Sequence, residues 1–205
     1  MKTNTLILNE LERLYPNPVP ELNFSNEYET LIAVMLSAQC TDKQVNKVTP
    51  TLFSEYPTAK DLANADIQQV YQIVRGCGFK SKATNIVEAC KVLVLEHEGK
   101  VPNNLKALTA LPGVGQKTAN VVLANAFGVP TIAVDTHVFR VSNRLGLANA
   151  KNVKETEKQL MQVIPTCNWI DSHHWLIFHG RRVCHARKPS CDNCTLHSLC
   201  AYIQT

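Results

Sequence analysis

LPGVGQKTA, residues 111–119, joins two stretches of helical periodicity through a proline, two glycines and a lysine. Gly113 and Gly115 can adopt positive φ angles and carry no Cβ, so their backbone N–H groups can face outward. The helix that begins near Gln116 adds unpaired N–H groups and the positive end of its dipole. Together these features suit a phosphate held by the main chain, although Gly-x-Gly alone is also typical of an ordinary connection between two helices.

Lys117 lies on the first turn of that helix, where the helix dipole disfavours a cation. The same field, combined with partial burial, would favour the neutral amine, which can attack an electrophilic carbon and form a Schiff base. A surface lysine with its charge in solvent explains this residue equally well by itself. A second stretch, residues 76–87, also has Gly-x-Gly before a lysine-bearing helix, so Lys80 and Lys82 are rivals for any role of Lys117.

Helical periodicity dominates the rest of the chain, which has 205 residues, 45% of them apolar, enough for one globular unit or two small packed ones. We therefore expect an all-α protein. An opening helix carries Leu6, Leu11 and Leu14 on one face, and Ser25 is a good N-cap for the second helix. Residues 131–134 should form an extended connector. Further helices are expected at residues 42–54, 59–63, 66–75, 81–97, 103–110, 117–127, 136–145, 152–164 and 171–180.

Composition and charge narrow the class of protein. The chain has neither the pattern of a signal peptide nor an apolar run long enough to span a bilayer, so we expect a cytoplasmic monomer. Lys and Arg number 12 against 12 Asp and Glu in residues 1–130, but 9 against 5 in residues 131–205. The excess in the last third weakly favours a polyanionic partner.

Asp135 precedes the expected helix at residues 136–145, and its simplest interpretation is an N-cap that accepts hydrogen bonds from the first turn. A catalytic role would require its carboxylate to share a site with Lys117. The sequence by itself does not decide whether the two side chains meet.

Four of the eight cysteines fall within 17 residues near the C-terminus, in the pattern Cys-x6-Cys-x2-Cys-x5-Cys, and they are Cys184, Cys191, Cys194 and Cys200. In a chain without a signal peptide, such a cluster indicates metal ligands rather than disulfides. Zinc remains possible on spacing alone, since His185 and His197 lie nearby. The other four cysteines are interpreted as small buried residues.

Three motifs of this chain together resemble the endonuclease III family of DNA repair glycosylases. They are LPGVGQKTANVV at residues 111–122, AVDTH at residues 133–137 and the spacing of the four clustered cysteines. Members of that family carry a helix–hairpin–helix motif of the form seen at residues 111–122. The motifs have the family's order and spacing over nearly the whole chain. The resemblance implies two helical lobes flanking a DNA-binding cleft. A six-helix module would span residues 21–130, and residues 1–20 and 131–205 would form an iron–sulfur cluster lobe.

The resemblance also implies a function. The chain would be a DNA glycosylase with β-elimination lyase activity on oxidised or ring-damaged pyrimidines or abasic sites in duplex DNA, which would place it at the nucleoid. Lys117 would be the nucleophile at C1′ and Asp135 its assistant. The four clustered cysteines would hold a [4Fe–4S] cluster.

The expected DNA contacts follow from the same resemblance. Gln39 matches the family's gap-filling glutamine, and the hairpin Gly113, Val114 and Gly115 would hold phosphate. Arg187 and Lys188 stand on a loop between the first two cysteines and suit phosphate contact, although two solvated charges are the simpler interpretation. Where close relatives place a leucine wedge, this chain has Gly78 followed by Phe79, which leaves the opposite-base preference open.

Two other functions are consistent with parts of the sequence. An adenine-excising relative would share the cluster but lack the lyase lysine, so Lys117 argues against it. A DNA-binding module without catalysis, stapled by iron–sulfur or zinc, would need neither Lys117 nor Asp135.

Overall fold

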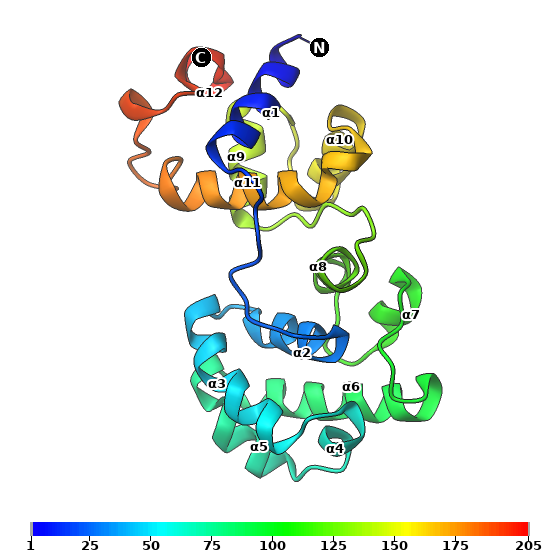
Figure 1. Ribbon diagram of the computed structural model, residues 1–205. Helices are drawn as coiled ribbons and strands as arrows, with labels where there is room; N and C mark the ends of the chain where they lie inside the picture. Colours follow the sequence, from blue (N-terminus) through cyan, green and yellow to red (C-terminus); the bar gives the residue numbers. More distant parts are fainter. Residues whose placement is uncertain (1, 205) are drawn as a thin grey trace. The chain divides into compact units, whose positions relative to one another are not determined.

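The computed structural model describes residues 2–204, in which helices and connecting loops make up the structure and no β-strand occurs (Figure 1). The first half contains α1 (Lys2–Leu14), α2 (Glu27–Ser37), α3 (Asp42–Glu55), α4 (Ala59–Ala63), α5 (Ile67–Val74), the 3₁₀ turn η1 (Arg75–Cys77), α6 (Lys80–His97) and α7 (Leu105–Ala110). The second half contains α8 (Gln116–Phe127), α9 (Thr136–Leu145), α10 (Val153–Val163), η2 (Thr166–Asn168), α11 (Trp169–Arg182), η3 (Cys191–Asn193), η4 (His197–Leu199) and α12 (Ala201–Gln204). The predicted all-α class is confirmed.

The helices form two compact units. One comprises Pro20–Val129 and is called the hairpin unit below. The other, the cysteine unit, comprises the described residues up to Val19 together with those from Pro130 onward. Each unit has its own cluster of buried apolar side chains. None of the described helices is long and apolar enough to cross a membrane.

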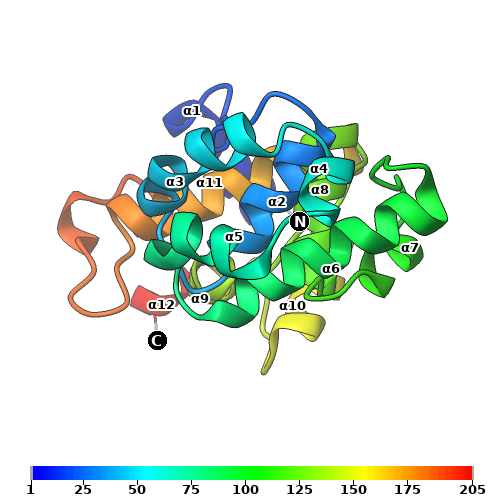
Figure 2. The ribbon, with the colours of Figure 1, turned by 90° about the horizontal axis from the view of Figure 1, so that it is seen from below.

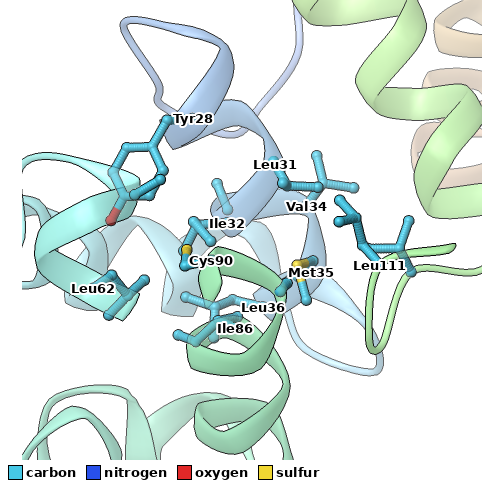
Figure 3. Close-up of a cluster of buried hydrophobic side chains, with 14 of the residues drawn as sticks. Tyr28, Leu31, Ile32, Val34, Met35, Leu36, Leu62, Ile86, Cys90 and Leu111 are labelled. Atoms are coloured by element: carbon cyan, nitrogen blue, oxygen red, sulfur yellow. The ribbon is translucent and has the colours of Figure 1, made fainter. Parts of the chain in front are cut away.

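In the hairpin unit, α2 is the central helix. Every residue from Thr30 to Leu36 is buried, and the helix packs against α3, α6 and α8. A helix that is apolar on all sides is stable only when other helices surround it. Figure 3 shows the side chain of Leu36, from α2, next to that of Ile86, from α6, in this core. Figure 2 shows α6 beside α4 and α5, with which it also packs. The core therefore holds the end of α2 and the start of α6 in fixed positions.

In the cysteine unit, α11 packs against both α9 and α1. The core includes Ile7 and Leu11 of α1, Val138 and Val141 of α9, and the indole ring of Trp175. The unit is thus built from the two ends of the chain, and its core carries the segment on which the four clustered cysteines lie.

Several local expectations need correction. Leu6 is 53% exposed, and Ile7 takes its place on the buried face of α1, whereas Leu11 is buried and Leu14 partly buried as expected. Ser25 is not the N-cap of α2. The cap is Asn26, whose side chain accepts from the Glu29 N–H at 2.9 Å, while the Ser25 N–H donates back to the Glu29 carboxylate. Ser and Asn are similarly good caps, so the choice depends on where the buried face of the helix must begin.

Candidate nucleic-acid and catalytic site

The hairpin between α7 and α8 is a tight turn held by backbone hydrogen bonds. The Leu111 N–H donates to Leu108 O and the Val114 N–H donates to Leu111 O, each at 3.1 Å. Leu111 and Val114 are buried, whereas Gly113 and Gly115 are exposed. The turn is therefore anchored by its apolar side chains and presents its glycines to solvent.

The two glycines have different reasons to be glycine. Gly113 has a φ of +75°, and a Cβ at this position would lie 2.8 Å from the Asn85 side chain of α6. Gly115 has an ordinary φ of −89° and is the N-cap of α8 without a capping side chain. The capacity of glycine for positive φ is therefore used at Gly113 and not at Gly115. At Gly115 a bare backbone leaves the N-terminus of α8 open to an anion.

Lys117 lies in the first turn of α8, one residue after the helix begins, and its side chain is exposed. The partial burial that would favour the neutral amine is thus not observed within the hairpin unit. Its position at the positive end of the α8 dipole, next to the glycine turn, is as expected from the sequence.

The structure distinguishes Lys117 from Lys82. The Lys82 Nζ donates hydrogen bonds to Leu36 O at 2.9 Å and to Cys77 O at 2.5 Å, and the side chain is half-buried. An amine whose hydrogens bind two carbonyls is occupied as a donor and is poorly placed to attack a substrate. Lys80 is exposed on the first turn of α6 and stays a possible rival to Lys117.

Gln39 lies in the short turn between α2 and α3 and is exposed. Its φ is +55°, a left-handed value that a residue other than glycine holds only where the surroundings enforce it. The Cys40 N–H donates to Ser37 O at 3.0 Å and closes this turn. The turn therefore displays Gln39 rather than packing it.

Gly78 and Phe79 form the turn between η1 and α6. Gly78 has φ 122° and ψ −139°, a conformation that is strained for residues with a side chain. Phe79 is the N-cap of α6, with extended backbone, and its ring is 77% exposed. The position of Phe79 at the start of α6 therefore leaves its side chain accessible to a partner.

Asp135 is the N-cap of α9 in the cysteine unit. One carboxylate oxygen, Oδ1, accepts from the Val138 N–H at 2.7 Å, so the capping interpretation is confirmed. The side chain is half-buried. Nearby, burial lowers the pKa of His137, while the Asp135 carboxylate acts in the opposite direction. Lys117 belongs to the hairpin unit and Asp135 to the cysteine unit.

The four clustered cysteines, Cys184, Cys191, Cys194 and Cys200, line one pocket together with Arg144 and His179. Burial is the main cause that raises the pKa of the Cys194 and Cys200 thiols. In the part of the chain that the structure describes, no three ligating side chains converge as the ligands of a single metal ion would. An iron–sulfur cluster has a different requirement, because each of its thiolates binds a different iron atom. Four thiols around one pocket fit that requirement.

Two arginines on α9 support this segment, and the sequence analysis missed both. Arg144 donates to Cys184 Sγ at 3.5 Å, to His185 O at 2.7 Å and to Ala186 O at 3.1 Å. Arg140 donates to Cys184 O at 3.1 Å and to Gly180 O at 3.0 Å. Their spacing of four residues, which places them on one face of α9, was the available signal.

Arg187 and Lys188, which follow the carbonyls bound by Arg144, are exposed on the loop between the first two clustered cysteines. Lys188 has a φ of +51°. The Ser190 N–H donates to Val183 O at 3.1 Å and closes the loop at its base. The loop that carries Arg187 and Lys188 is therefore held by Arg144 on one side and by the Ser190–Val183 hydrogen bond on the other.

Comparison with known proteins agrees with this arrangement of motifs. Residues 32–166 match the family model of the HhH-GPD superfamily base excision DNA repair proteins. The chain is 50% identical to Endonuclease III of Escherichia coli over 197 residues, which are 96% of this chain and 93% of that protein. It is 47% identical to Endonuclease III of Synechocystis sp. over 202 residues, 98% of this chain and 92% of that protein.

Solved structures give the same result. A non-covalent Endonuclease III–DNA complex matches with a TM-score of 0.94 and 45% identity, covering 99% of this chain and 96% of that one. The fold and the hairpin thus define a base excision DNA repair protein of the helix–hairpin–helix class. Within that class, the chain belongs to the endonuclease III family. It is accordingly a DNA glycosylase and abasic-site lyase.

Proposed function

We propose that this chain removes oxidised or ring-damaged pyrimidines from duplex DNA and then cuts the strand by β-elimination. The observation that carries this proposal is the exposed Lys117 on the first turn of α8, directly after a glycine turn whose Gly115 N-cap brings no capping side chain to the N-terminus of this helix, which suits phosphate. Such a turn can bind the phosphate backbone of DNA of any sequence, and the amine of the lysine supplies the nucleophile.

The reaction begins with the Lys117 Nζ attacking C1′ of an extruded nucleotide, which breaks the C1′–base bond, and the departing base takes up a proton. Cleavage of the C1′–O4′ bond then opens the sugar ring and leaves a Schiff base between C1′ and Nζ. Loss of a proton from C2′ then breaks the C3′–oxygen bond, and hydrolysis of the Schiff base returns the free lysine. Asp135 assists through Oδ2, because Oδ1 is occupied by the Val138 N–H. Its roles are to accept the proton from the amine and to stabilise the positive charge that develops on the sugar.

The remaining residues bind and open the duplex. Gln39 enters the space left by the extruded nucleotide, and Phe79 takes the place of a leucine wedge. The hairpin Gly113, Val114 and Gly115 holds phosphate, and Arg187 and Lys188 contact phosphate elsewhere.

We propose a [4Fe–4S] cluster as the cofactor, held by Cys184, Cys191, Cys194 and Cys200. When bound, the cluster supplies four metal–thiolate bonds that cross-link residues 184–200. Arg144 supports the first ligand through its hydrogen bond to Cys184 Sγ. A purified protein with this cluster is yellow-brown, whereas one that holds zinc at the same cysteines is colourless.

Borohydride trapping on duplex DNA that contains thymine glycol or an abasic site tests the reaction. The wild-type chain should give a covalent adduct, Lys117→Gln should give none, and the matched control Lys80→Gln should give as much as wild type. Asp135→Asn should slow base excision by about 100-fold or more, since a positioned acid–base group contributes at least that much.

Two outcomes would contradict the proposal. A wild-type chain that forms no adduct would exclude the lyase reaction and favour a binding module or an adenine-excising enzyme. An adduct that survives Lys117→Gln and is lost in Lys80→Gln would transfer the nucleophile to the other glycine turn.

A further inference from the structure

Lys82 connects two segments of the hairpin unit that are distant in the sequence. Its Nζ donates to Leu36 O at 2.9 Å, near the C-terminal end of α2, and to Cys77 O at 2.5 Å, at the end of η1. The half-buried side chain starts from the first turn of α6. One amine therefore holds the ends of two separate helices.

Both carbonyls lie directly before exposed turns. Leu36 is three residues before Gln39, and Cys77 is two residues before Phe79. These are the two side chains that the proposed function places inside the opened duplex, and the inference rests on that function. Loss of both hydrogen bonds at Lys82 would therefore free the two turns to shift relative to each other.

The two turns have backbones that require such support. Gln39 has a φ of +55°, which a residue other than glycine keeps only where its surroundings restrain it, and Gly78 has a φ of +122°, which only glycine adopts readily and which leaves the backbone of this turn free to move unless it is held. A Cβ at Gly78 would lie 3.7 Å from the Lys82 Nζ, so the amine sits against this turn. η1 also packs against α3, where a Cβ at Gly76 would overlap the Gln44 side-chain amide.

We propose that Lys82 is a positioning residue that sets the separation of Gln39 and Phe79 and thereby supports extraction of the damaged base. Lys82 does not touch the substrate. Its charge also complements the negative end of the α2 dipole, which explains why an ammonium is used rather than a neutral donor.

The test compares two duplex substrates, one with thymine glycol and one with an abasic site. Lys82→Met keeps the apolar stem but removes both hydrogen bonds, and should slow excision of thymine glycol by about 10- to 100-fold, since misplacement by about 1 Å can cost that much. Cleavage at the abasic site should change far less, because no base has to be extracted and Lys117 is intact. Lys82→Arg should restore most of the excision rate.

A fluorescent base analogue next to the lesion reports extraction directly, because unstacking increases its emission. This increase should be smaller in Lys82→Met than in wild type, and it should be unchanged in Lys80→Met, an exposed lysine two residues away. Thermal unfolding of all variants separates a local displacement from loss of the fold.

The role of Lys82 would be overturned if Lys82→Met excised thymine glycol at the wild-type rate, or if it lost excision and abasic-site cleavage to the same extent. Either result would leave the proposed function intact. A wild-type chain inactive on both duplexes would overturn the proposed function and this role together.

Discussion

At the scale of the residue, the backbone conformation of Gly78 bears on which side chain can act as the wedge in the opened duplex. A side chain at this position could not serve as a wedge without strain, because φ 122° with ψ −139° is unfavourable for any residue other than glycine. The next residue, Phe79, has ordinary extended backbone and a ring that is 77% exposed. The wedge is therefore expected one position later in this chain, and as a ring rather than an aliphatic group.

Phe79→Ala should reduce excision of thymine glycol by about 10-fold, since stacking of a base on an aromatic ring contributes about 1–3 kcal/mol. Phe79→Leu should retain more activity than Phe79→Ala because it still fills the gap. Excision kinetics measure both, and Leu95→Ala, which removes another exposed apolar side chain of the same unit (83% exposed), is the control. Equal rates for Phe79→Ala and wild type would show that the ring is not the wedge.

At the scale of the element, α9 carries both Asp135, at its N-terminus, and the two arginines that bind the segment around Cys184. Its N-terminus is capped by Asp135, and its last two turns carry Arg140, which donates to Cys184 O, and Arg144, which donates to His185 O. The proposed catalytic carboxylate and the loop of Arg187 are therefore attached to the same rigid helix. A displacement of that helix would affect both.

Arg187→Ala combined with Lys188→Ala should weaken binding to all duplex sequences. The slope of log affinity against log salt concentration should become less steep by about 1.8, because each phosphate contact contributes about 0.9. Binding titrations at several salt concentrations measure this slope. The control is Lys151→Ala with Lys154→Ala, an exposed pair at the start of α10 in the same unit. An unchanged slope in the first variant would remove the loop from the DNA interface.

At the scale of the whole molecule, the cysteine unit depends on contacts between the two ends of the chain. The Tyr15 hydroxyl at the end of α1 lies 3.1 Å from His179 Nδ1 on α11. His173, His174 and His179 are all buried on α11, and burial lowers the pKa of His179 to about 4. Because burial lowers the pKa of His174 and of His179, protonating either imidazole in the folded unit lowers the free energy of unfolding.

His174 gives this dependence a direction. Burial lowers its pKa from the usual 6.5, and Asp171 only partly opposes the shift. The unfolded chain therefore binds this proton more readily, so the stability present above pH 6.5 is lost as the pH falls through the lowered value. His174→Gln should flatten the decrease in the free energy of unfolding below pH 6.5. Denaturant unfolding at several pH values measures this, with the less buried His97→Gln as control, and an unchanged pH profile would exclude His174 as a cause.

The sequence by itself determined what depends on local chemistry. The helices, the glycine turn at Gly113, the capping role of Asp135 and the grouping of the four clustered cysteines depend on residues close together in the chain. The periodicity of apolar residues, caps and spacing therefore predicted them. The family followed from the same motifs, since their order is a property of the sequence.

Only the tertiary structure decided how residues in similar local sequences differ in their contacts and exposure. Lys82 and Lys117 both follow a glycine turn, and packing alone brings Lys82 to Leu36 O, 46 residues away, while Lys117 stays exposed. In the same way, Arg144 reaches His185 O across 41 residues, and Gly113 but not Gly115 adopts positive φ against Asn85. These differences arise because a side chain takes its partner from whichever element packs beside it, and the packing of distant helices is not encoded in any single stretch.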